Sequence, residues 1–358
     1  MKKEDPFFLE ETFHKKDHKS FKKEKKKASS LDRSKYKKTD QKKKEPLLID
    51  PSYKRGRVIS FSSDQIEVKL ENKTLTCSLK GSLKKEKSRK KNLICVGDFV
   101  WVDALKKQVA IVEDRFSFLA RVDPVRKKEH YIAVNVDQVF ITCSVFLPPL
   151  RPFLIDRYII AAHKGGMTPI IVVNKIDLLD KSEKERIRYR EFLSTYQELG
   201  MGVFPVSTVK EEGLEEVKKA MEGKTSVFSG QSGVGKSSLL NLLLGLDLKV
   251  GDITEKKYRG KHTTTKAHLI ELEGGGFCID TPGIKHFGLW ELTLQEVQNY
   301  YVEIKEKAKD CKYPNCKHLQ EPDCAVKASV DSGEISYLRF ESYQSLLEEV
   351  LEDKKDYA

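Results

Sequence analysis

The chain has 358 residues, of which 39% are hydrophobic and 34% charged, and its formal net charge is +12. This length suffices for two or three domains with separate cores, and no apolar run reaches the roughly 18 residues of a membrane-spanning helix. Residues 1–30 mix acidic side chains into a sequence without a continuous apolar segment, so we expect neither a signal peptide nor a transit peptide. We therefore expect a cytoplasmic protein with no membrane partner.

The positive charge is concentrated at the start of the chain. Residues 1–45 hold 17 Lys and Arg against 9 Asp and Glu, which leaves a surplus of only 4 for the remainder. Few aliphatic side chains occur there, so residues 1–52 are predicted to form a disordered basic extension. Such a segment either keeps the protein soluble or binds nucleic-acid phosphates, and composition favours neither role.

Residues 53–123 show the alternation of half-buried strands. Five short segments carry it: RVISF (57–61), IEVKL (66–70), LTCSL (75–79), DFVWV (98–102) and VAIV (109–112). Five such strands predict a small β-barrel of the oligonucleotide-binding (OB) type. The basic loop 80–91 between the third and fourth strands is either an RNA or DNA contact or a solvated surface loop.

Residues 124–290 change to alternating strands and helices. The segments DQVFITCS (137–144) and PIIVVN (169–174) are continuously apolar, as strands of a parallel sheet covered on both faces are. Residues 182–200 predict a helix with Ser182 as its N-cap and Gly200 at its end. Together these signals predict a doubly wound α/β domain.

The segment 230–238 follows the phosphate-loop pattern between a predicted strand and helix. Its residues are Gly230, Gln231, Ser232, Gly233, Val234, Gly235, Lys236, Ser237 and, directly after the pattern, Ser238. The glycines let backbone NH groups face phosphate oxygens, Lys236 brings a positive charge to the β- and γ-phosphates, and the Ser237 hydroxyl can ligate Mg²⁺.

A second motif selects the base. Asn174, Lys175, Ile176 and Asp177 follow a predicted buried strand and match the NKxD motif of GTPases. The Asp177 carboxylate can accept hydrogen bonds from the N1–H and the amino group of guanine, whereas adenine would leave this charge unpaired. Ser207 and Thr208 lie where GTPases place a loop that contacts the guanine oxygen.

A third motif completes the predicted site. Asp280 ends a strand, as a Walker-B aspartate near Mg²⁺ does, and the NH of Gly283 is placed to meet the γ-phosphate. Of the threonines at 263–265, we expect Thr264 to ligate Mg²⁺. Ile284 occupies the position where many GTPases have a water-orienting glutamine, so we expect His262 either to take that catalytic role or only to pack or bind a partner.

Residues 291–358 predict two helices, over 292–310 and 335–355, around a cysteine-rich loop. The loop offers three thiols and one imidazole, which is a ligand set for a tetrahedral structural Zn²⁺: Cys311, Cys316, His318 and Cys324. A disulfide or unligated cysteines are the alternatives. The remaining cysteines are expected to be small buried side chains: Cys77, Cys95, Cys143 and Cys278.

In their order, these motifs resemble the RsgA family of ribosome small-subunit-dependent GTPases, over about residues 53–354. The matching segments are NKID (174–177), GQSGVGKS (230–237), HTTT (262–265), DTPG (280–283) and the Cys-x4-Cys-x-His-x5-Cys ligands. The resemblance implies an OB-type barrel (53–123), a circularly permuted GTPase domain (124–290) and a helical zinc-binding domain (291–358). It also implies GTP hydrolysis with Mg²⁺, binding to the small ribosomal subunit and its rRNA late in assembly, and release driven by subunit-stimulated hydrolysis to GDP.

Two other functions fit parts of the sequence. Ile284 and the basic segments would suit a non-catalytic RNA-binding scaffold that a bound nucleotide stabilises. A phosphotransferase would use the same phosphate loop, but its chemistry gives no reason for a guanine-reading motif. We expect a monomeric GTPase.

Overall fold

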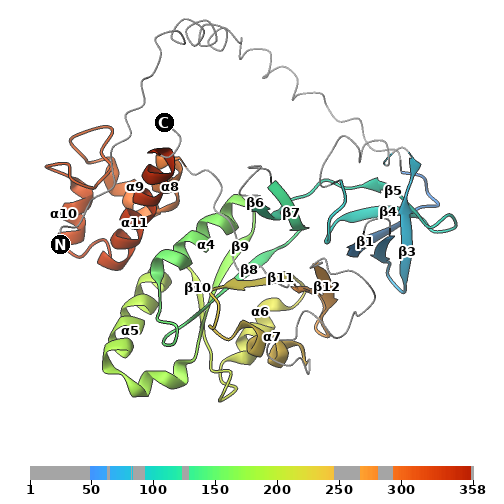
Figure 1. The fold of residues 1–358 in the computed structure, drawn as a ribbon, viewed down its shortest axis with the longest axis horizontal. Coiled ribbons are helices and arrows are strands. Elements are labelled where there is room, and N and C mark those ends of the chain that lie inside the picture. Colours follow the sequence, from blue (N-terminus) through green and yellow to red (C-terminus); the bar gives the residue numbers. More distant parts are fainter. Residues whose placement is uncertain are drawn as a thin grey trace, which may run out of the picture. The chain divides into compact units, whose positions relative to one another are not determined.

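Figure 1 shows the computed structural model of the chain. The residues that it describes are 49–62, 65–81, 83, 93–122, 129–245, 267–280 and 293–355. Residues 1–48 of the predicted basic extension, most of the basic loop 80–91, and the predicted site residues His262, Thr264 and Gly283 lie outside them. The chain divides into two compact units, residues 1–50 and 51–358, and the helices and strands of the described residues belong to the second.

The predicted barrel is confirmed. Its strands are β1 (Lys54–Ser62), β2 (Gln65–Lys69), β3 (Thr74–Leu79), β4 (Phe99–Asp103) and β5 (Gln108–Val112), which close in the order β1-β2-β3-β5-β4. The alternating apolar side chains point inward, and Val58, Val68 and Val100 are fully buried in the barrel core. A two-stranded antiparallel sheet that the sequence did not predict follows, formed by β6 (Phe118–Val122) and β7 (Glu129–Val134).

A six-stranded sheet forms the centre of the next region. In the order in which they pair, its strands are β10 (Gly202–Pro205), β9 (Thr168–Asn174), β8 (Gln138–Ser144), β11 (Thr225–Gly230), β13 (Phe277–Asp280) and β12 (His268–Glu271). The first five are parallel and β12 is antiparallel to β13. All seven residues of β8 are buried, as the continuous apolar run predicts for a strand covered on both faces.

Helices cover both faces of this sheet, so the predicted doubly wound fold is confirmed. The helices are α4 (Pro152–Lys164), the 3₁₀ turn η1 (Ile176–Lys181), α5 (Glu183–Glu198), α6 (Leu214–Met221) and α7 (Lys236–Leu244). The core against α4 and α5 contains Val139 and Ile141, whereas the core against α6 and α7 contains Phe140 of the same strand. Helix α5 starts as predicted, with the Ser182 hydroxyl accepting from the backbone NH of Glu185.

The C-terminal region contains four helices: α8 (Leu294–Tyr300), α9 (Val302–Ala308), α10 (Ala325–Asp331) and α11 (Tyr337–Lys355). The helix predicted over 292–310 is interrupted at Tyr301, whose backbone has φ −97° and ψ 85° and whose ring is buried. In and just before α11, apolar side chains that recur at helical spacing are buried: Ile335, Leu338, Tyr343, Leu346, Leu347 and Val350. Ile160 of α4 contributes to the same core.

No helix in the described part of the chain has the length and apolar character needed to span a bilayer.

Candidate nucleotide-binding site and metal centre

The described parts of the predicted nucleotide motifs lie at the carboxyl ends of strands of the six-stranded sheet. The strands β9, β11 and β13 end at Asn174, Gly230 and Asp280, and β10 leads into Ser207. These strands are parallel, so their carboxyl ends lie at the same edge whatever their order along the chain. Although the NKID segment (174–177) precedes the phosphate loop (230–237) along the chain, both therefore lie at the same edge of the sheet.

The phosphate loop connects β11 to α7, which begins at Lys236. The N-terminus of a helix at this point presents backbone NH groups and a positive dipole end to an anion. Gly235 has φ +92°, and a Cβ there would lie 2.4 Å from Nδ2 of Asn174. Only glycine fits this close approach between the phosphate loop and the NKID segment.

Lys236 is held inside the phosphate loop by two backbone carbonyls. Its Nζ donates to the oxygens of Gly230 and Gln231, each at 2.7 Å. Burial lowers the pKa of this ammonium group to about 8. The two carbonyl oxygens offer Lys236 only partial negative charges, whereas a bound phosphate would offer a full one.

Asn174 ties three loops together and is fully buried. Its Nδ2 donates to the carbonyl of Val234 in the phosphate loop at 2.9 Å. Its Oδ1 accepts from the backbone NH of Lys175 at 2.7 Å and from that of Thr208 at 3.2 Å. Because the amide is hydrogen-bonded on both sides, Asn174 holds the NKID segment and the loop at Thr208 in register with the phosphate loop.

Lys175 adds a contact that the sequence did not reveal. Its Nζ donates to the carbonyl of Gly233 at 2.8 Å and also to the carbonyl of Leu147. Leu147 lies in the segment between β8 and α4. One ammonium group therefore joins the phosphate loop to the segment that leads into α4.

Asp177 is oriented by a serine that the sequence assigned only to the guanine-oxygen loop. The Ser207 hydroxyl donates to Oδ1 of Asp177 at 2.7 Å and accepts from the backbone NH of Lys210 at 3.1 Å. This pair fixes one carboxylate oxygen before any base is present. A pre-oriented acceptor lowers the entropy that binding would otherwise lose.

Three further predicted site residues lie at the ends of α7 and β13. Ser237 and Ser238 lie in the first turn of α7, and Asp280 ends β13, whose residues 277–279 pair with 225–227 of the phosphate-loop strand.

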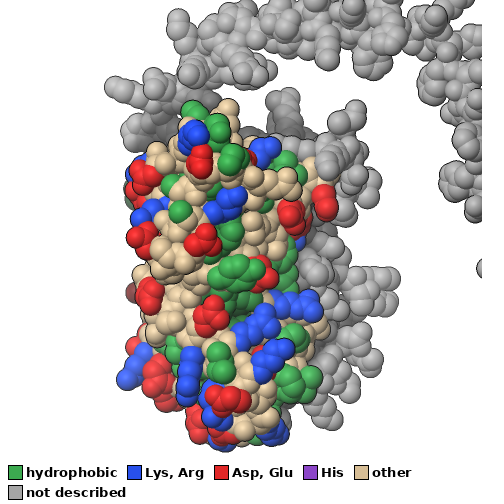
Figure 2. Space-filling model, turned by 90° about the vertical axis from the view of Figure 1, so that its left-hand side faces the viewer, with side chains coloured by type: hydrophobic (Ala, Val, Ile, Leu, Met, Phe, Trp, Pro, Cys, Tyr) green, Lys and Arg blue, Asp and Glu red, His purple; other side chains and the backbone are tan. Residues whose placement is uncertain are grey.

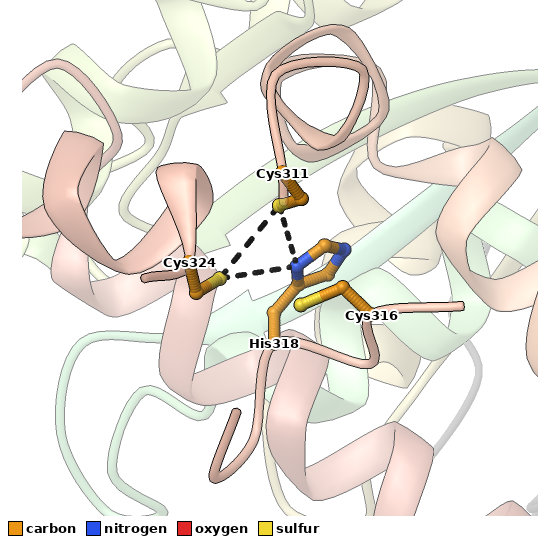
Figure 3. A group of neighbouring side chains, drawn as sticks. All are labelled: Cys311, Cys316, His318 and Cys324. Carbon is orange, nitrogen blue, oxygen red and sulfur yellow. Dashed lines mark hydrogen bonds between the residues drawn. The ribbon is translucent and has the colours of Figure 1, made fainter. Parts of the chain in front are cut away.

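The four predicted metal ligands form one cluster (Figure 3). The ligand atoms of Cys311, Cys316, His318 and Cys324 all lie within 4.8 Å of one another. The Nδ1 of His318 is 3.3 Å from Sγ of Cys324 and 3.6 Å from Sγ of Cys311, and these two sulfurs are 3.9 Å apart. Tetrahedral zinc, with bonds of about 2.1 Å to nitrogen and 2.3 Å to sulfur, places its ligand atoms about 3.5–3.8 Å apart. The donor set fits such an ion, and the three distances among His318, Cys311 and Cys324 lie close to this range.

The loop around this cluster is fixed by backbone contacts. The Glu321 carboxylate accepts from the backbone NH groups of Lys317 and Leu319, both at 3.0 Å. His318 is fully buried, with φ +62°. No disulfide forms, because all seven cysteines are free. The other four cysteines are buried, as expected.

Comparison with known proteins decides the family. The RsgA GTPase family model matches residues 112–290. The small ribosomal subunit biogenesis GTPase RsgA 1 of Vibrio vulnificus is 39% identical over 270 residues, which cover 74% of this chain and 76% of the relative. The small ribosomal subunit biogenesis GTPase RsgA of Bacteroides fragilis is 35% identical over 307 residues, covering 84% of this chain and 98% of the relative. The chain belongs to the RsgA GTPase family.

Solved structures agree with this assignment. YjeQ from Thermotoga maritima superposes with a TM-score of 0.67 at 30% identity, covering 84% of this chain and 99% of that one. YloQ, described as a circularly permuted GTPase, gives a TM-score of 0.64 at 27% identity, with coverages of 84% and 96%. The predictions of a GTPase and of a circularly permuted fold are therefore confirmed for this RsgA family member, with a barrel before the sheet region and a helical region carrying the Cys3His cluster after it.

Proposed function

We propose that this GTPase binds the small ribosomal subunit through its rRNA and assists late maturation, with subunit-stimulated hydrolysis coupled to release. One observation carries the proposal. The Bacteroides fragilis small-subunit biogenesis GTPase aligns along 98% of its own length and 84% of this chain, well beyond the matched GTPase region 112–290. A GTPase domain alone does not specify a target, so likeness in the flanking barrel and helices supports a shared partner.

For the nucleotide we propose GTP and GDP, with Asp177 reading the guanine and Lys236 bound to the β- and γ-phosphates. Mg²⁺ would be held by Ser237, Asp280 and Thr264, where it would neutralise charge on the phosphate oxygens. The position of Ser237 in the first turn of α7 and of Asp280 at the end of β13 supports the first two.

For the hydrolytic step we propose that His262 orients the attacking water, because Ile284 can neither donate nor accept a hydrogen bond. A His262→Ala variant should then lose turnover while keeping its GDP affinity. Equal loss of both would assign His262 to packing or partner binding instead.

For the cysteine cluster we propose one structural Zn²⁺. Three thiolates and an imidazole fill the four positions of a tetrahedron and leave none open for substrate. The metal would supply folding energy to a loop whose side chains are mostly polar.

We also propose the division into a basic extension (1–52), barrel (53–123), GTPase domain (124–290) and zinc-binding domain (291–358), and a monomer acting in the cytoplasm. On the side drawn in Figure 2, basic and acidic side chains are interspersed over most of the face, and several Lys and Arg side chains adjoin one another in its lower part. For rRNA binding we favour the basic segments 1–52 and 80–91, which carry dense runs of Lys.

The test is GTP hydrolysis by the full chain with purified small subunits, large subunits or naked rRNA. We expect stimulation by small subunits alone, and none with a Lys236→Ala variant as the control. Ile284 and the basic segments would also suit a non-catalytic scaffold, which would bind small subunits with no gain in hydrolysis. Equal stimulation by all three additions would contradict a small-subunit-specific role.

A further inference from the structure

His318 is held between the thiol cluster and a side chain from a distant helix. On one side of the ring, Nδ1 faces the sulfurs of Cys324 and Cys311 at 3.3 and 3.6 Å. On the other side, Nε2 lies 2.9 Å from the amide nitrogen of Gln298, a partly buried residue of α8. None of the sequence motifs includes Gln298.

The chemistry of a metal-bound imidazole explains why this contact matters. When Nδ1 binds a metal, the ring proton resides on Nε2 and needs an acceptor. A carboxamide can present either its nitrogen or its oxygen, so rotation of the Gln298 amide by a half turn meets that need without moving α8. The Gln298 amide can therefore hydrogen-bond to Nε2 of His318 in either tautomer of the ring.

We propose that Gln298 is an outer-sphere positioning residue of the zinc site, whose amide oxygen accepts the Nε2–H of His318 and keeps Nδ1 aimed at the metal. This inference rests on the proposed binding of zinc by the cluster.

Burial makes the contact difficult to replace. The His318 side chain has no exposed surface, and its ring packs 6.0 Å, centroid to centroid, from the ring of the buried Tyr343. Water has no direct access to take over as acceptor, so loss of the amide would leave a buried donor unpaired. Outer-sphere partners of this kind typically change metal affinity by about 10- to 100-fold.

The placement of Gln298 also has a consequence for the architecture. Helix α8 is the first described helix after Asp280 along the chain. Gln298 therefore connects the metal-binding loop to the helix that follows the predicted nucleotide motif. Metal occupancy would then help fix the position of α8.

The experiment measures Zn²⁺ affinity of the full chain by competition with a chromogenic chelator. We expect Gln298→Leu to weaken Zn²⁺ binding by about 10- to 100-fold, because leucine has a similar size and no acceptor. Gln298→Glu, which restores an acceptor, should bind as tightly as the wild type or more tightly. The matched control is Gln295→Leu on the same helix, whose side chain is more exposed, contacts no metal ligand and should leave the affinity unchanged when replaced.

Two results would overturn the role of Gln298: equal affinities for the Gln298→Leu and Gln295→Leu variants, or equal weakening by leucine and glutamate at 298. Co²⁺ absorption at saturating metal separates misfolding from weak binding. A retained tetrahedral spectrum with reduced affinity supports the proposal, and a collapsed spectrum in both 298 variants rejects it. A wild-type chain that binds no Zn²⁺ would reject the metal site itself, whereas tight wild-type binding with an unaffected Gln298→Leu variant rejects only this inference.

Discussion

Asp156 on α4 and Arg339 on α11 form a buried ion pair across 183 positions of sequence. Their side chains are 1% and 6% exposed. Burial alone would lower the pKa of Arg339, but the Asp156 carboxylate and its neighbours outweigh this effect, and the pKa is raised well above its ordinary value. The guanidinium therefore remains charged, and the pair joins a helix of the six-stranded sheet region to the C-terminal helices.

Hydroxyl groups complete the environment of the Asp156 carboxylate. Tyr196 of α5 donates to Oδ1 at 2.6 Å, and Tyr301 donates to Oδ2 at 3.2 Å. Ser342 of α11 also donates to Oδ2. The contact with Tyr301 comes from the residue at which the predicted helix 292–310 is interrupted, so a tertiary hydrogen bond lies at the break.

The first prediction concerns how much the ion pair between Asp156 and Arg339 stabilises the protein. Asp156→Asn keeps the size and an acceptor for the tyrosines but leaves the charge of Arg339 without its partner on α4. We expect it to lower the free energy of unfolding by about 3–5 kcal/mol, measured by urea denaturation followed by circular dichroism. Arg339→Gln should cost a similar amount, and the double variant should lose less than the sum.

The control for this cycle is the neighbouring pair Arg157 and Glu349, which also joins α4 to α11 but is about one third exposed. Replacing both residues with alanine should cost less than about 1 kcal/mol. Additive losses for Asp156→Asn and Arg339→Gln would show that the two side chains do not stabilise each other.

The second prediction concerns base selection. Asp177→Asn leaves one acceptor oxygen and puts an NH₂ donor where the second carboxylate oxygen would accept from guanine. This amide can instead donate to the C2 carbonyl of xanthine. We expect GDP affinity to fall by roughly 100-fold or more and affinity for xanthosine diphosphate to rise, both measured by calorimetry. Asp180→Asn, at a carboxylate that is 83% exposed in the same turn, is the control and should change neither. Retained preference for GDP in the Asp177 variant would reject this residue as the base reader.

The third prediction concerns the close approach at Gly235. Gly235→Ala would force its Cβ against Nδ2 of Asn174, which would break the contact between the phosphate and base-reading loops. We expect GDP affinity to fall at least about tenfold, in addition to a backbone cost of about 1–2 kcal/mol. Gly223→Ala is a matched control, because Gly223 also has a positive φ, of +67°, but a Cβ at this position would meet only open space. Similar losses of affinity in both variants would point to general strain instead.

The fourth prediction follows from the pKa of Lys236, which burial lowers to about 8. Below this pH the free protein carries the ammonium charge that phosphates require, and above it the charge is lost. GDP affinity should therefore fall as pH rises from 7 to 9, by roughly tenfold. The Lys236→Met variant should bind GDP weakly and lack the pH dependence caused by the Lys236 ammonium group. Any pH dependence that remains in this variant comes from other groups, such as those of the nucleotide. The same pH dependence in both proteins would contradict the assignment.

The fifth prediction concerns metal removal. Chelation should increase amide hydrogen exchange over residues 311–324, because the metal supplies the folding energy of this loop. Exchange in the sheet strands β8 and β11 should remain unchanged, since their cores do not include the cluster. Mass spectrometry before chelation, after chelation and after Zn²⁺ is restored provides the measurement. Unaltered protection of 311–324 throughout would exclude a structural metal.

Much of this molecule could be predicted because local chemistry specifies it. Alternation of apolar side chains determined the barrel strands, and the Ser182 hydroxyl determined the start of α5. The glycines of the phosphate loop and the ligand spacing from Cys311 to Cys324 identified the two sites. Each of these signals acts within a few residues of its position in the sequence.

Only the tertiary structure revealed which distant groups meet. Three contacts join segments that share no local sequence pattern. They are the ion pair of Asp156 with Arg339, the hydrogen bond from Lys175 to the Leu147 carbonyl, and the contact of the Gln298 amide with His318. Such contacts depend on which polar groups are buried together and must satisfy one another. That condition is set by the packing of whole helices and sheets, which no short stretch of sequence contains.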